Sequence, residues 1–248
     1  MDSLKINVET SSNWTKTKTV DYLMESFQRF ETLDQKESLD LYIDSSGYLN
    51  EYIGLAGVYK QFDNQNRITK RIGYDLKGDY YLWDYSPIEA TEYHNDSTIL
   101  TRYNFQFILS ERVIIIKDSK DRIVETLYYD KNLKLYSRIA SEYADLQNEL
   151  LIITYDGDGK LKSNANGVAI RLEILDSIDR EFIVEERFYD ANMNLIDADH
   201  SSLNSFGFKC EYSILRRELI NKEERISYFN SKDKLQCESD GISMWTTD

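Results

Sequence analysis

The stretch Tyr155-Asp156-Gly157-Asp158-Gly159-Lys160-Leu161 decides the fold of this chain. Its aspartate, Asp156, is expected to accept hydrogen bonds from the N–H groups two and three residues on, which favours a type I turn. The fourth turn residue, Gly159, suits the left-handed backbone that a type I turn followed by a bulge requires. The basic residue points to solvent and Leu161 returns to the buried side, so the stretch predicts a β-hairpin.

The same signature recurs along the chain, with Asp or Asn first, usually Gly, Asn or Asp fourth, and an apolar residue at the close in most copies. Further copies lie at residues 43–49, 62–68, 74–80, 117–123, 129–135, 144–150, 189–195 and 229–235. In two of them Leu133 and Met193 hold the fourth position. Such side chains disfavour a left-handed backbone, so we expect those two turns to be longer or differently wound.

A longer repeat covers the C-terminal part of the chain. Residues 167–195 and 207–235 align without gaps at a spacing of 40 residues (207 − 167). Gly167 matches Gly207, and Tyr189 matches Phe229. Self-similarity at a fixed period is typical of a repeat architecture.

One segment near the N-terminus has a different period. From Thr19 to Phe30, apolar residues recur at spacings of three and four, which predicts one amphipathic helix capped by Thr19. They are Val20, Leu23, Met24, Phe27 and Phe30. The predicted fold is therefore mainly β: an antiparallel meander of tandem β-hairpin repeats with one N-terminal amphipathic helix. We expect one continuous β assembly over residues 1–248. Its possible subdivision is into residues 1–97, which hold the helix and the first hairpins, and residues 98–248, a regular array of hairpins.

The composition indicates the cellular compartment and the class of binding partner. The formal net charge is −14 and the sequence pI is about 4.7, which disfavours direct binding to nucleic acid or to anionic membranes. The first residues contain no apolar signal segment, and the apolar runs are too short to cross a bilayer. We therefore expect a cytoplasmic protein whose partner is another protein, one with a basic surface.

No catalytic, metal or cofactor motif emerges from the sequence. Asp156 opens a superficial calcium loop, but Lys160 stands where an oxygen ligand is needed. Asp197, Asp199 and His200 are more typical of a solvated loop, and His94 is the second of only two histidines, too few for a His-rich zinc site. The two cysteines, Cys210 and Cys237, are expected to be buried, inert and too far apart for a disulfide.

One region combines acidic and aromatic residues. Residues 78–101 contain no Lys or Arg. Rings that supply contact area and carboxylates that attract a basic protein predict a partner-binding surface. Its candidate residues are Asp79, Tyr81, Trp83, Asp84, Tyr85, Glu89 and Glu92. The alternative is an irregular loop whose rings cover the sheet.

The turn signature resembles a known family. Residues Tyr155 to Leu161 are similar to the Tyr-Asp-x-x-Gly-Arg-Leu core of bacterial YD-repeat (Rhs-type) sequences, and degenerate copies extend over roughly residues 44–235. The resemblance implies a bacterial protein of tandem β-hairpins. It does not imply the enclosing shell of the large family members, because that shell needs far more strands.

The sequence favours a non-enzymatic protein-interaction module, with an intracellular inhibitor or immunity-type protein as its specific form. Two alternatives stay open. One is an acidic DNA mimic that inhibits a nucleic-acid-binding protein, although the acidic residues are interleaved with 30 basic ones. The other is a metal-dependent enzyme with a carboxylate-based site.

Overall fold

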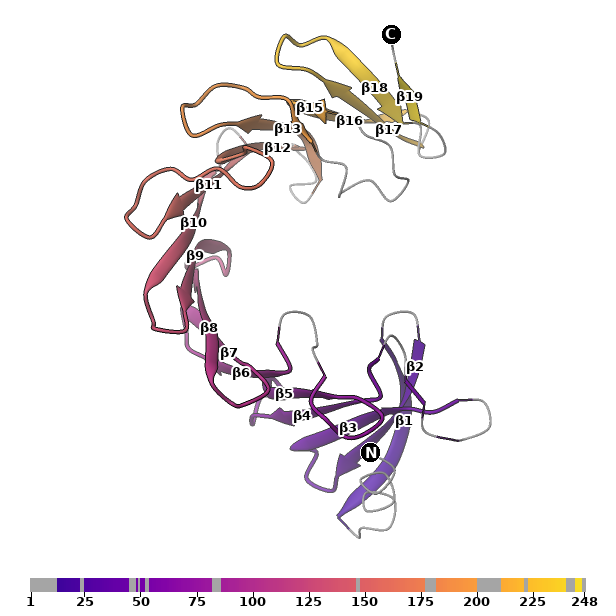
Figure 1. Ribbon diagram of the computed structural model, residues 1–248. Helices are drawn as coiled ribbons and strands as arrows, with labels where there is room; N and C mark the ends of the chain where they lie inside the picture. The colour runs from indigo at the N-terminus through magenta and orange to yellow at the C-terminus, as the bar shows by residue number, and fades with distance from the viewer. Residues whose placement is uncertain are drawn as a thin grey trace. The chain divides into compact units, whose positions relative to one another are not determined.

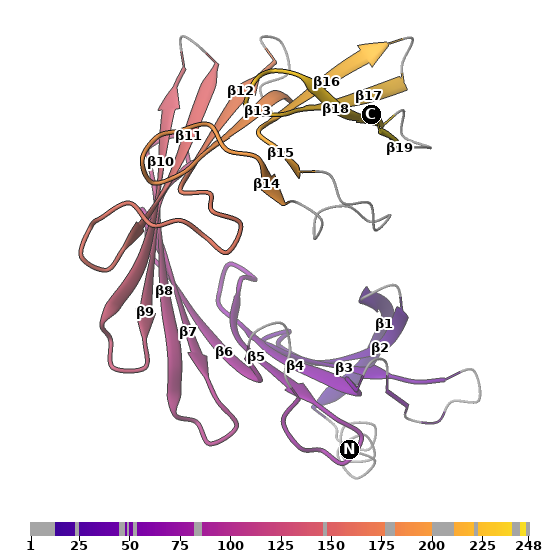
Figure 2. The ribbon, with the colours of Figure 1, turned by 45° about the horizontal axis from the view of Figure 1, so that its top comes forward.

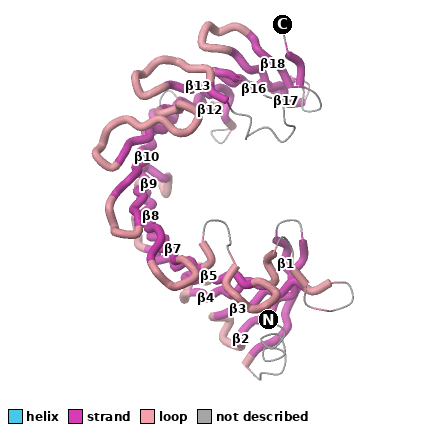
Figure 3. Tube along the Cα trace, in the orientation of Figure 1, coloured by secondary structure: helices cyan, strands magenta, loops and turns pink. Residues whose placement is uncertain are grey.

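The structure is a computed structural model that describes residues 13–22, 25–44, 48, 50–51, 54–81, 86–145, 148–176, 182–199, 211–220, 223–239 and 244–246. In this part of the chain the backbone forms strands, turns and loops, and no helix occurs (Figure 3). The prediction of a mainly β protein is confirmed. The chain divides into two compact units, and residue 98, the expected point of subdivision, lies inside a strand of the first unit.

The first unit comprises residues 1–114 and 129–134. Its strands are β1 (Trp14–Tyr22), β2 (Glu25–Thr32), β3 (Glu37–Tyr42), β4 (Gly57–Phe62), β5 (Ile68–Tyr74), β6 (Ile88–Tyr93) and β7 (Ser97–Tyr103). Each of them pairs antiparallel with the next in sequence (Figures 1 and 2). Two further strands, β8 (Leu109–Lys117) and β9 (Ile123–Asp130), contribute residues to both units.

The second unit comprises residues 115–128 and 135–248. Its strands are β10 (Leu135–Ala144), β11 (Glu149–Asp156), β12 (Ile170–Leu175), β13 (Ile183–Tyr189), β16 (Ile214–Ile220), β17 (Glu223–Phe229), β18 (Leu235–Ser239) and β19 (Met244–Thr246). They pair antiparallel in that order. The short strands β14 (Ala198–Asp199) and β15 (Glu211–Tyr212) pair with each other as a separate ribbon. The antiparallel meander of hairpins is therefore confirmed in each unit.

The turns that fold the meander share one geometry. In the turn after β4, the Asp63 carboxylate accepts hydrogen bonds from the N–H groups of Gln65 (2.8 Å) and Arg67 (3.0 Å). The N–H of Asn66 donates instead to the backbone carbonyl of Asp63 (3.2 Å), and Asn66 has a φ of 59°. The expected side-chain bond to the third residue was thus wrong. Because that N–H closes the backbone turn, the carboxylate binds the N–H groups two and four residues on.

The same arrangement occurs at most other turns of the signature and at two further turns, which begin at Asn104 and Asn164. It is complete at Asp75, Asn104, Asp118, Asp130, Asp156, Asn164, Asp190 and Asn230. The expectation that Leu133 and Met193 would alter their turns was wrong. Both residues adopt the left-handed backbone, with φ of 59° and 65°, inside turns of the usual length. The hydrogen bonds of the first turn residue, an aspartate in both cases, outweigh the unfavourable φ of the fourth.

The predicted helix from Thr19 to Phe30 is corrected by the structure. Residues on both sides of the undescribed pair 23–24 belong to β1 and β2, which form a hairpin. Phe27 and Phe30 lie three residues apart on a strand and so point to opposite faces. Phe27 packs with Leu55 and Val58, whereas Phe30 packs in a second cluster with Leu39 and Leu41. Since both faces are covered, the strand carries apolar residues at a spacing of three, which also fits a helix.

The repeat of the C-terminal part is confirmed with a correction. Strands β13 and β17 and the turns after them correspond at the expected spacing of 40 residues (229 − 189). Their partner strands do not. Ile170 pairs with Tyr189, and Ile214 pairs with Phe229, so the equivalent residues of β12 and β16 are 44 apart (214 − 170). A gapless alignment cannot show this, because the paired residues are 19 positions apart in the first hairpin (189 − 170) and 15 apart in the second (229 − 214).

Candidate functional site

Two turns of the first unit carry exposed apolar side chains. In the turn between β7 and β8, Asn104 accepts hydrogen bonds from the N–H groups of Gln106 (2.9 Å) and Ile108 (3.0 Å). The other turn follows β5 and is built in the same way on Asp75. The rings of Tyr80 and Phe107 meet edge to face with centroids 5.2 Å apart, which brings the two turns together.

We call the exposed and partly exposed apolar side chains of these two turns the turn patch. Phe105, Phe107 and Ile108 are 54%, 53% and 54% exposed. On the turn after β5, Leu76 and Tyr80 are partly exposed. The turn patch consists of Leu76, Tyr80, Phe105, Phe107 and Ile108. Clustered exposed apolar side chains are typical of a protein-interaction surface.

The backbone of Phe107 is strained. Its φ is 60°, in the left-handed region that costs a residue with a side chain about 1–2 kcal/mol. At the equivalent position, Asn66, Gly78 and Asp121 tolerate this conformation better, whereas Leu133 and Met193 adopt it with the same disfavoured kind of side chain as Phe107. Phe107 therefore combines backbone strain with a half-exposed ring, and neither feature improves the stability of the turn. Strain of this kind clusters at functional sites.

The charge beside the turn patch is mixed. The Asp75 carboxylate is occupied by its own turn. Asp79, four residues on, is exposed, and among the described residues no ion pair is formed by its side chain. Lys77, at the tip of the same turn, is exposed as well. The turn patch thus has an available carboxylate at its edge.

The structure disperses the described residues of the predicted acidic-aromatic surface. Asp79 lies at the turn patch. Tyr81 packs on the buried cluster of Phe27, Leu55 and Val58, and its ring fills the space over Gly54, where an added Cβ would lie 2.5 Å from the Tyr81 Cε2. Trp83, Asp84 and Tyr85 lie outside the described residues.

The two glutamates of that surface lie on β6. Glu89 is bound between the guanidinium groups of Arg71 and Arg102, each at 3.2 Å. Glu92 is exposed near the opposite end of the strand, where one carboxylate oxygen lies 4.0 Å from His94 Nε2. Asp79 is therefore the only described member that the structure places beside the turn patch.

Sequence reasoning missed Phe105, Phe107 and Ile108. The stretch Asn104-Phe105-Gln106-Phe107-Ile108 begins with Asn, but it has Phe at the fourth turn position and no basic residue at the fifth. The available signal was an asparagine that can begin the same turn, followed by apolar residues where solvent-exposed ones are usual.

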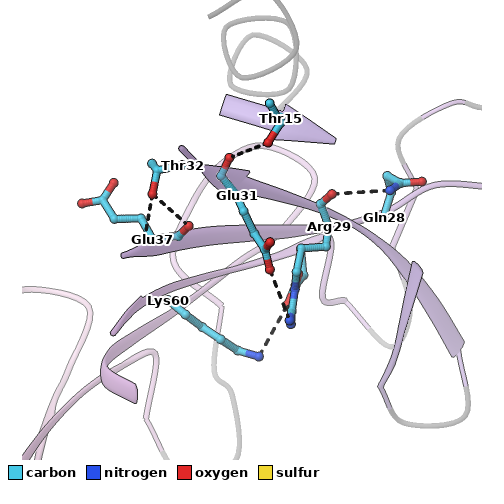
Figure 4. A network of polar contacts seen from close by, with 8 residues as sticks. Thr15, Gln28, Arg29, Glu31, Thr32, Glu37 and Lys60 are labelled. Carbon is cyan, nitrogen blue, oxygen red and sulfur yellow. Dashed lines mark hydrogen bonds and ion pairs between the residues drawn. The ribbon is translucent and has the colours of Figure 1, made fainter. Parts of the chain in front are cut away.

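A buried ionic network crosses one face of the first unit (Figure 4). Arg29 on β2 binds both carboxylate oxygens of Asp40 on β3, at 2.6 and 2.9 Å, and Asp40 is fully buried. Lys60 on β4 lies 3.4 Å from the same carboxylate. Burial and the neighbouring charge of Arg71 lower the pKa of Lys60 to about 8. Because Asp40 is bound by two cations, the arrangement holds strands together rather than offering a carboxylate for acid–base chemistry.

A pair of buried glutamates lies in the second unit. Glu173 on β12 and Glu186 on β13 are directly opposite each other in the strand register. Burial raises the pKa of Glu173. Each carboxylate has an arginine: Arg171 at 2.6 Å from Glu173, and Arg217 at 3.6 Å from Glu186. The two side chains are therefore held as ion pairs.

The remaining candidates for metal binding or catalysis have structural roles or lie outside the described residues. The Asp197 carboxylate accepts hydrogen bonds from the Ser213 hydroxyl (2.5 Å) and the Ser231 N–H (2.6 Å), so it ties two segments together. His200, Cys210 and the side chains of Asp199 and Cys237 lie outside the described residues. Among the residues described, no group of three His, Cys, Asp or Glu side chains is arranged to hold a metal ion.

No helix in the described part of the chain is long and apolar enough to span a membrane. Neither a protein-family model nor a curated protein sequence matches the chain.

Proposed function

We propose that this protein is a non-enzymatic protein-binding module and that the turn patch contacts its partner. The observation that carries the proposal is Phe107, a half-exposed ring held on a strained backbone and in contact with Tyr80 of the turn after β5. A large ring that packs into a partner supplies contact area at a small loss of side-chain entropy. That gain offsets the cost of the left-handed backbone.

The expected partner is a protein with a basic rim around an apolar pocket. The net charge of −14 attracts a basic surface over long range, and Asp79 provides a carboxylate beside the aromatic contact. An intracellular inhibitor or immunity-type role is the specific form of this proposal. It rests on the size and acidity of the chain and on its YD-repeat-like turns.

The test separates binding from folding through one substitution. Phe107→Gly removes the ring and relieves the backbone, so the variant should fold at least as stably as the wild type while losing its partner. The partner is captured from the native host with wild-type protein, identified by mass spectrometry, purified and titrated by surface plasmon resonance. We expect Phe107→Gly to weaken binding at least about tenfold, as for a central interface aromatic.

Leu133→Gly is the matched control. Leu133 occupies the same turn position with nearly the same φ, 59° against 60°, and is also half exposed, but it is not part of the turn patch. This variant should keep the wild-type affinity. Equal binding by the wild type and Phe107→Gly would show that the turn patch is not part of the interface.

A further inference from the structure

The second unit contains a hollow of about 560 Å³ on one face of its sheet. Leu151 and Ile153 of β11 and Ile170 and Leu172 of β12 form its floor. In the strand register Leu151 lies opposite Leu172, and Ile153 lies opposite Ile170, so all four side chains belong to the same face. Tyr155, Tyr189 and Met193 line its sides.

The corresponding face of the first unit is filled. Tyr74, like Tyr155 and Tyr189, directly precedes a turn aspartate. Each tyrosine forms an isolated antiparallel β-bridge with the residue six positions on. On the face of Tyr74 the side chains of Phe30, Leu39 and Leu41 are at most 2% exposed, and Trp14 and Ile43 pack against them. In the described part of the second unit the equivalent face is only partly covered: Ile153 and Ile170 are 8% and 6% exposed, whereas Leu151 and Leu172 are partly buried.

The chemistry of the hollow favours an uncharged occupant. Among the residues described, no charged side chain lines it. Two arginines adjoin lining residues, and both are paired. Arg187, opposite Leu172, binds Glu185 at 2.5 Å, and Arg138, over the ring of Tyr155, binds Glu125. An ionic group placed on the floor would lose its hydration without gaining a partner. The phenol groups of Tyr155 and Tyr189 are the polar groups at the sides.

We propose that this hollow binds one small, neutral, apolar molecule, such as an aromatic ring system or a hydrocarbon chain. Its volume falls in the range of roughly 300–1,000 Å³ typical of small-molecule sites, which are concave and mostly apolar with a few polar groups. The ligand covers this floor as Trp14 and Ile43 cover Phe30, Leu39 and Leu41 in the first unit.

Two fluorescent probes with the same rings test the charge and the site together. N-phenylnaphthylamine is neutral, and anilinonaphthalene sulfonate carries a sulfonate on the same ring system. Titration of the full chain should show saturable binding of one neutral probe per chain. The sulfonate should bind at least about tenfold more weakly, because the apolar floor cannot solvate it.

The variants locate the probe. Met193→Lys places a charge at the side of the hollow on a turn residue that is 71% exposed, so folding is retained. Leu133→Lys makes the same change at the same position of another turn, and Leu133 is not among the residues that line the hollow. We expect Met193→Lys to weaken the neutral probe about fivefold or more and Leu133→Lys to leave it unchanged.

Leu172→Trp, which fills the floor, should also abolish probe binding with unchanged circular dichroism. The proposal is overturned by non-saturable binding, by equal effects of the two lysine variants, or by preference for the sulfonate. Each of these outcomes is independent of the partner-binding test on the first unit.

Discussion

At the scale of single residues, the stability of this protein depends on the first and fourth positions of its turns. The first residue supplies a side-chain oxygen that accepts two backbone hydrogen bonds. Asn104 and Asn164 make the same two bonds as the aspartates of the other turns. The fourth residue only has to adopt a positive φ. Leu133, Met193 and Phe107 do so with side chains that this conformation disfavours.

Replacing Leu133 with Gly should therefore stabilise the protein. The substitution relieves the left-handed backbone and removes a side chain that is 52% exposed, so we expect about 1 kcal/mol of added stability in urea denaturation. Gly159→Ala is the reverse control, since its φ is +83° and nothing lies within 4 Å of the added Cβ. A loss of stability in Leu133→Gly would show that the leucine contributes packing.

The ionisation of Lys60 predicts a dependence on pH. Its pKa is about 8 in the folded protein against about 10.4 in an unfolded chain. Between these values the unfolded state binds more protons, so the contribution of Lys60 to the free energy of unfolding increases as the pH rises from 8 to 10. Relative to Lys60→Met, the wild type should gain roughly 1–3 kcal/mol over that interval.

Urea denaturation at pH 7, 8, 9 and 10 measures this difference. Lys77→Met, a substitution at an exposed turn tip, is the matched control and should follow the wild type at every pH. A constant difference between wild type and Lys60→Met would contradict the assigned burial of the ammonium group.

At the scale of elements, the turns also fix neighbouring strands. The turn that starts at Asp156 lies against the beginning of β10, and a Cβ added to Gly157 would lie 2.1 Å from the carbonyl oxygen of Leu135. Glycine is thus required at this position by a close backbone approach. Two residues on, glycine is favoured at Gly159 for a different reason, because the backbone there has a positive φ.

Gly157→Ala should consequently destabilise the protein more than Gly159→Ala. The first substitution pushes the turn away from β10 and should cost about 2–3 kcal/mol, as other overpacked sites do. The second leaves the packing unchanged and should cost about 1 kcal/mol. Thermal unfolding of both variants compares them directly, and the opposite order would refute the close approach.

At the scale of the whole molecule, each strand of the meander takes its hydrogen bonds mainly from the strands next to it in sequence, as in other repeat assemblies. The two compact units have separate buried clusters. One cluster of the first unit consists of Phe30, Leu39 and Leu41, and one cluster of the second unit includes Phe188, Tyr212 and Tyr228. A lesion in one cluster should therefore remain local.

Leu39→Ala tests this locality. Removal of a side chain that is 2% exposed should cost about 2–5 kcal/mol in the first unit. Hydrogen exchange followed by mass spectrometry should show faster exchange in β2 to β4 and unchanged protection in β16 and β17. Equal acceleration in both units would show that the chain unfolds as one cooperative body.

The sequence by itself determined the turns, and through them the strands and the antiparallel meander. Asp or Asn at the first turn position acts through hydrogen bonds within five residues, so its effect is visible in a short stretch such as Tyr155 to Leu161. The segment containing Phe27 and Phe30 could not be assigned in this way, because its spacing fits a helix stripe as well as a strand covered on both faces.

Only the tertiary structure decided which side chains meet. Glu89 and Tyr81 belong to a composition typical of a binding surface, but ion pairing and core packing occupy them. Tyr80 and Phe107 are 27 residues apart (107 − 80) and form one surface because strand pairing places their turns side by side. The physical reason is range: turn chemistry acts between near neighbours in the chain, whereas surfaces and hollows arise from the register of strands distant in sequence.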